Sequence, residues 1–138
     1  MRYLAIDYGR KRIGLAICDA SEMIASPLTV IDGGKEPIKR IVEIVTQENV
    51  GAIVVGMPLN MDDSEGPQAK ETMEFAERLK KHVEIDVFFQ DERLSSFAAE
   101  EKMASAELSR KKKRKYLDAV AAAQILETFL ENRRAGSQ

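Results

Sequence analysis

The sequence has almost no cysteine or histidine. Its 138 residues include one of each. Cys18 cannot form an internal disulfide, and its place in a strand-like run predicts a packed, inert side chain. Because zinc sites and histidine-based triads need several such residues, both kinds of site are excluded. His82 stands among charged residues near a predicted helix end, so we expect it at the surface.

Long apolar runs and a strong net charge are also missing. No apolar run approaches the ~20 residues of a membrane span, and Asp7 stands where a signal peptide needs its apolar centre. We therefore expect a cytoplasmic protein. The formal net charge of −2 argues against a generic nucleic-acid coat protein. The length predicts one globular domain, residues 1–138, with a real hydrophobic core.

Positive charge is nevertheless concentrated in two places. Residues 110–115 read Arg-Lys-Lys-Lys-Arg-Lys, and residues 10–12 read Arg-Lys-Arg. The longer run could be a solvated loop, but it also precedes a candidate metal ligand, where it would suit phosphate binding. No aromatic residues interrupt it, so binding would read the nucleic-acid backbone more than the bases.

Hydrophobic periodicity predicts an α/β fold with a mixed five-stranded sheet and helices packed on it. The first three strands are antiparallel, and Pro27 places the third at an edge or makes it irregular. Two helix–strand units and two further helices follow. The predicted strands cover residues 2–8, 12–18, 24–31, 50–55 and 84–89, and the helices cover 37–49, a segment after Pro67, about 96–108, and 117–133.

Asp7 and Glu92 each lie at the end of a predicted strand. A carboxylate there must face water, a partner or a metal, because burying it unpaired is costly. Asp7 could simply begin the hairpin turn, but small residues at Gly14 and Ala16 on the paired strand would leave an open floor for a ligand or metal. Glu92 lies where open α/β sheets bind ligands. It could equally be a solvated loop residue, and the adjacent Asp91 is an alternative to it.

Asp118 is expected to begin the last helix, on the same face as apolar residues. No base three or four residues later neutralises it. The alternative is a helix N-cap, for which Asp is favoured. Since histidine and cysteine are scarce, any hydrolytic chemistry would come from carboxylates, lysines or hydroxyls, and carboxylates favour hard cations such as Mg²⁺ or Mn²⁺.

Four motifs together resemble the YqgF (RuvX) family. They are Asp-Tyr-Gly-Arg-Lys-Arg-Ile-Gly-Leu-Ala at 7–16, Val-Gly-Met-Pro at 55–58 with Gly-Pro-Gln-Ala at 66–69, Asp-Glu-Arg-Leu-Ser-Ser at 91–96, and Asp-Ala-Val-Ala-Ala at 118–122. The resemblance implies a ribonuclease-H-like fold related to Holliday-junction resolvases. It also implies a nuclease that matures the 5′ end of the 16S ribosomal RNA precursor.

The resemblance further implies that Asp7, Glu92 and Asp118 form the catalytic, metal-binding cluster. Two Mg²⁺ (or Mn²⁺) ions could then deprotonate a water and stabilise the leaving oxygen, with Asp7 bridging them. RNA is favoured as partner and branched DNA is possible, for a monomer or a homodimer. The alternatives are a Holliday-junction resolvase, a non-catalytic nucleic-acid-binding module, and a phosphotransferase of the actin and sugar-kinase type. The predicted nucleic-acid-binding residues are Arg10, Lys11, Arg12, Arg93, Lys111, Lys112, Lys113, Arg114 and Lys115.

Overall fold

The computed structural model describes residues 1–59, 66–92 and 110–136, except for the side chains of 110–115. Its centre is a five-stranded sheet of β1 (Tyr3–Asp7), β2 (Arg12–Cys18), β3 (Ala25–Asp32), β4 (Ala52–Met57) and β5 (Asp86–Asp91). The strands lie in the order β3-β2-β1-β4-β5. β1, β2 and β3 pair antiparallel, while β4 and β5 run parallel to β1 and to each other. The predicted mixed sheet is thereby confirmed, with the proline-containing β3 at an edge.

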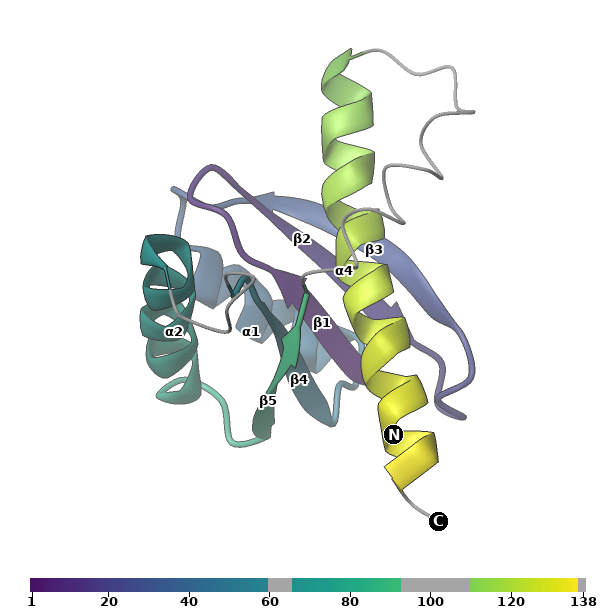
Figure 1. Cartoon of the computed structure of the whole chain (residues 1–138). Helices are drawn as coiled ribbons and strands as arrows, with labels where there is room; N and C mark the ends of the chain where they lie inside the picture. The colour runs from purple at the N-terminus through teal and green to yellow at the C-terminus, as the bar shows by residue number, and fades with distance from the viewer. Residues whose placement is uncertain (60–65, 93–109, 137–138) are drawn as a thin grey trace.

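Helices cover both faces of this sheet. α1 (Pro37–Gln47) and α2 (Pro67–Lys80) each carry proline in the first turn, where its missing N–H costs nothing. Both pack on one face, and the long α4 (Arg110–Gly136) crosses the other (Figure 1). Within the described residues, no helix is long and apolar enough to cross a membrane.

The core follows the alternation of the strands. Tyr3 and Ala5 of β1 face α4, whereas Leu4 and Ile6 face α1 and α2. Asp7 continues the first set, so its side chain lies on the α4 side of the sheet. Cys18 is buried on the same side, as predicted.

Three predicted elements have wrong boundaries, and one predicted helix lies outside the described residues. β4, predicted at 50–55, begins at Ala52 and ends at Met57. β5 begins at Asp86 and ends at Asp91, about two residues later than predicted, so Glu92 directly follows the strand. α4 begins at Arg110, seven residues before the predicted start. The basic run is therefore helical and not a loop, since Lys and Arg are good helix formers. The helix predicted near 96–108 falls within residues 93–109, which the structure does not describe.

Candidate functional site

Asp7 lies at the end of β1 with a glycine on the strand on each side. In the β1–β2 ladder its partner is Gly14. On the other side, Gly56 follows Val55, the β4 partner of Ile6, so it lies beside Asp7. The bare backbone at these two positions leaves space on the α4 side of the sheet.

The other two carboxylate residues fill this space. A Cβ on Gly14 would lie 2.1 Å from the main-chain oxygen of Asp118, and a Cβ on Gly56 would lie 2.4 Å from Oε2 of Glu92. Both distances are far below van der Waals contact. The two glycines therefore allow Asp118 and Glu92 to approach Asp7.

The predicted open floor at Gly14 is wrong. The main chain of α4 occupies the position of the missing Cβ, and Ala16 is fully buried beneath the same helix. The small residues serve helix–sheet packing at this point, because a long helix can cross a sheet closely only where side chains are short.

Strand alternation also decides between Asp91 and Glu92. Phe88 of β5 packs on the α4 side and Phe89 on the opposite side, so Glu92 belongs with Phe88, and Asp91 with Phe89. The Glu92 N–H donates to the Met57 carbonyl oxygen at 3.3 Å. The carboxyl of Glu92 shares a hydrogen bond with that of Asp7. Glu92 thus meets Asp7, while Asp91 points to the other face.

Burial and mutual repulsion raise the pKa values of this pair. Burial is the larger cause for Asp7, followed by the negative charge of Asp118, and its pKa rises to about 6. Burial again comes first for Glu92, followed by the charge of Asp7, and its pKa rises to about 8. Glu92 therefore keeps the proton at neutral pH and donates it to Asp7. With Glu92 protonated and Asp7 ionised, the pair carries one net negative charge.

Asp118 is not a helix N-cap. It lies eight residues after the start of α4, inside the helix, which excludes the capping alternative. A base does neutralise it, but from β2 and not from its own helix. The Arg12 Nε–H donates to Asp118 Oδ2 at 2.7 Å. The sequence predicts nucleic-acid binding for Arg12; the structure places it first in β2 and pairs it with a predicted metal ligand.

The donor set has the chemistry of a hard-cation site. Asp7, Glu92 and Asp118 offer only carboxylate oxygens, the ligands that Mg²⁺ and Mn²⁺ prefer. Within the part of the chain that the structure describes, no cation forms an ion pair with Asp7 or Glu92. In the described residues, however, no three acids, histidines or cysteines are already arranged as a complete ligand set. Asp7 and Glu92 bond to each other, and Asp118 bonds to Arg12.

A basic cavity of about 390 Å³ lies at the β1–β2 turn and shares Arg12 with the acidic cluster. The turn between β1 and β2 lines it with Arg10, Lys11 and Arg12, and α2 contributes Gln68 and Glu71. The Arg10 Nε–H donates to Glu71 Oε2 at 2.9 Å, so one cation of the turn is anchored to α2. The predicted contacts of Arg93 and of the side chains at 111–115 lie outside the described residues.

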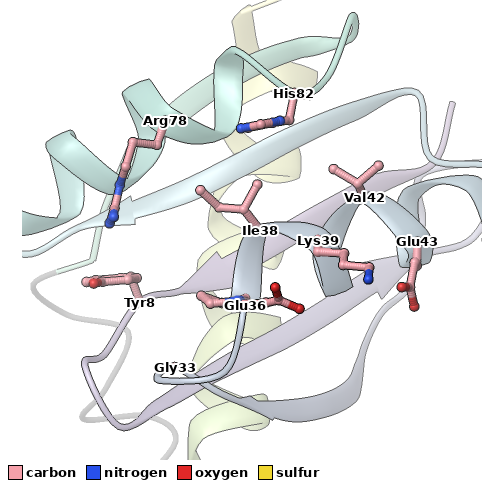
Figure 2. Close-up of a pocket in the computed structure, with 10 residues that line it drawn as sticks. Tyr8, Gly33, Glu36, Ile38, Lys39, Val42, Glu43, Arg78 and His82 are labelled. Atoms are coloured by element: carbon pink, nitrogen blue, oxygen red, sulfur yellow. The ribbon is translucent and has the colours of Figure 1, made fainter.

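A larger cavity, of about 570 Å³, lies between α1 and α2. Figure 2 shows Arg78 of α2 and His82, which follows α2, facing Ile38 and Val42 of α1 across it. His82 is exposed, as predicted. This cavity lies on the sheet face opposite the carboxylates, because its helices pack against Leu4 and Ile6, not against the α4 side. It is separate from the acidic cluster.

Sequence reasoning missed two contributors to the site. Gly56 stands out in the sequence only as part of a motif, although a glycine ending a buried strand beside a strand-end acid is itself a signal of close approach. Glu71 gives no signal, because its pairing with Arg10 depends on how α2 sits against the β1–β2 turn. Both act through contacts between segments that are far apart in the sequence, and spacing along the chain does not reveal such contacts.

Comparison with known proteins decides the family. The model of the RuvX family, described as Holliday junction resolvase, matches residues 1–132. This chain belongs to the RuvX family. Relatives named "Putative pre-16S rRNA nuclease" include one from Roseiflexus sp. (strain RS-1), 40% identical with 96% of each chain covered. Another, from Bacillus cereus (strain B4264), is 42% identical and covers 96% of this chain and 100% of its own.

Solved structures support the same fold for this RuvX-family chain. The fowlpox virus resolvase in complex with Holliday junction DNA gives a TM-score of 0.62 at 12% identity, covering 96% of this chain and 99% of its own. T. thermophilus RuvC in complex with a Holliday junction substrate gives 0.62 at 14% identity, covering 99% and 97%. The predicted ribonuclease-H-like fold and the family resemblance are confirmed.

Proposed function

We propose that this RuvX-family chain is a divalent-metal-dependent nuclease that hydrolyses phosphodiester bonds. The observation that carries the proposal is the meeting of Asp7, Glu92 and Asp118 at one end of the sheet, beside a cavity lined by three cations. The three acids come from β1, the end of β5 and α4, so only the fold brings them together. A nucleic acid lying in the cavity would bring a phosphate next to the acids.

Each group has a role that its surroundings suit. Asp7, Glu92 and Asp118 would hold Mg²⁺ or Mn²⁺ through oxygen. When bound, such a cation lowers the pKa of a water and neutralises charge on the phosphate. Glu92, with its raised pKa, must release its proton before its carboxylate can act as a ligand, so the loaded site forms with proton release. Lys11 and Arg12 would hold the backbone of the strand.

We propose RNA as the substrate, in the maturation of pre-16S ribosomal RNA. Support comes from relatives that carry this name at 40% and 42% identity over almost the whole chain. A Holliday junction is the second candidate, favoured by the family description and by the resolvases with the same fold. The structural neighbours are only 12–14% identical, so they support the fold more than the substrate.

The test compares cleavage of an RNA spanning the 5′ end of 16S precursor with cleavage of a four-way DNA junction of matched length. Both are incubated with the purified chain and Mg²⁺ or Mn²⁺, with Asp7→Asn as control. We expect metal-dependent cleavage of the RNA that EDTA and Asp7→Asn abolish. Cleavage of the junction alone would favour the second candidate. Tight binding in EDTA without cleavage under any metal would refute catalysis and favour a binding module.

A further inference from the structure

Arg12 belongs to both parts of the proposed site, the acidic cluster and the basic cavity. Its Nε–H donates to Asp118 at 2.7 Å, and Arg12 is also one of the residues, with Arg10 and Lys11, that line the basic cavity. Alternation along β2 explains the contact with Asp118. Arg12 lies two residues before Gly14, on the same sheet face, and Gly14 is the position over which the Asp118 main chain passes.

The Arg12–Asp118 contact competes with a metal for the same carboxylate. In the described residues the acids do not form a complete ligand set, and Asp118 is the one bonded to a cation instead of to another acid. A divalent ion and a guanidinium beside one carboxylate repel each other. The ion pair is also easily exchanged, since the two side chains are 40% and 25% exposed.

We propose that Arg12 is a positioning residue that holds Asp118 until a divalent cation takes this carboxylate, and that its guanidinium then binds the phosphodiester in the adjacent cavity. This inference rests on the proposed nuclease function. A planar guanidinium with several N–H donors suits both partners, because carboxylate and phosphate present similar pairs of oxygens. Arg12 would thus couple metal binding to substrate binding.

The first experiment measures Mn²⁺ binding to the nucleic-acid-free protein by titration calorimetry. Partly exposed ion pairs change an equilibrium constant by about 1.5- to 5-fold, so Arg12→Gln should bind Mn²⁺ tighter by about that factor. Arg10→Gln is the matched control: it removes the same charge from the same turn, but the partner of Arg10 is Glu71 of α2. We expect its Mn²⁺ affinity to equal that of wild type.

A double-mutant cycle tests whether Arg12 acts through Asp118. In an Asp118→Asn background there is no carboxylate charge to compete for, so Arg12→Gln should give no further gain in Mn²⁺ affinity. An equal gain in both backgrounds would overturn the proposal, as would unchanged or weaker Mn²⁺ binding by Arg12→Gln alone. If the Gln variant folds poorly in circular dichroism, Arg12→Lys keeps the charge, loses the Nε donor and should give a smaller gain.

Catalysis supplies an independent readout. Arg12→Gln should cleave more slowly at saturating Mn²⁺ although it binds the metal more tightly, because the phosphate loses its arginine. A merely structural arginine would lower both quantities together. A wild-type protein that binds no Mn²⁺ would refute the nuclease function itself. If the wild-type protein binds Mn²⁺ but Arg12→Gln does not show tighter binding together with slower cleavage, only the positioning role of Arg12 is refuted.

Discussion

Gly56→Ala should damage the site with only a moderate loss of stability. The new Cβ would lie 2.4 Å from Glu92 Oε2 and 2.5 Å from Ile125 Cδ1, whereas ordinary contact begins near 3.4 Å. Both atoms are side-chain ends and must each retreat by about 1 Å. Overpacking of this kind costs about 1–3 kcal/mol, partly offset by about 0.4–1 kcal/mol from the stiffer unfolded chain. A displacement of about 1 Å in a catalytic group can lower the rate about 100-fold.

The measurements are the free energy of unfolding in urea, Mn²⁺ affinity by calorimetry, and the cleavage rate. Gly34→Ala is the control, because its Cβ would meet only Asp32 Oδ1 at 3.4 Å, and Gly34 has no positive φ. We expect the control to match wild type in all three. A Gly56→Ala protein with wild-type Mn²⁺ affinity and cleavage would show that Glu92 does not need this gap, and the argument from the flanking glycines would fail.

Three further predictions concern charge. Because the pKa values of Asp7 and Glu92 are raised, the folded metal-free protein binds more protons than the unfolded chain between about pH 4 and pH 8, so its stability falls as pH rises through that window. In urea titrations, Asp7→Asn should make stability depend less on pH and should raise the free energy of unfolding at pH 8 by roughly 1–3 kcal/mol. It should also abolish cleavage. An unchanged pH profile would refute the coupling between Asp7 and Glu92. Asp118→Asn should lose metal-dependent cleavage. Its free energy of unfolding should fall by at most about 1 kcal/mol, because the ion pair with Arg12 is partly exposed. Normal cleavage would remove Asp118 from the site. Replacing lysines 111–113 by Gln should reduce the slope of log affinity against log salt by roughly 0.7 per lost phosphate contact on a single strand, and an unchanged slope would refute phosphate binding by the run.

Sequence patterns are sufficient to predict the mixed sheet and which residues of a strand share a face. Alternation in β1 groups Asp7 with Tyr3 and Ala5 on one face, and the structure shows that this is the face on which α4 packs. The same reasoning fails at the start of α4, because a run of cations carries no apolar periodicity even where it is helical. It also fails for Asp118, whose neutralising base is 106 residues away in sequence. Helix-local rules look only three or four residues ahead and cannot detect such a partner.

The start of α4 connects the basic run with the acidic cluster. Residues 110–115 precede Asp118 by three to eight residues on one continuous helix, so they lie about 4–12 Å from it along the axis. The first turns of α4 extend beyond the sheet edge (Figure 1), while Asp118 sits where the helix crosses Gly14. A helix of this kind fixes the spacing between the basic run and the acid more firmly than a loop would. A nucleic acid held by the run would therefore meet the carboxylates at a set distance, which favours selection by backbone path over selection by base sequence.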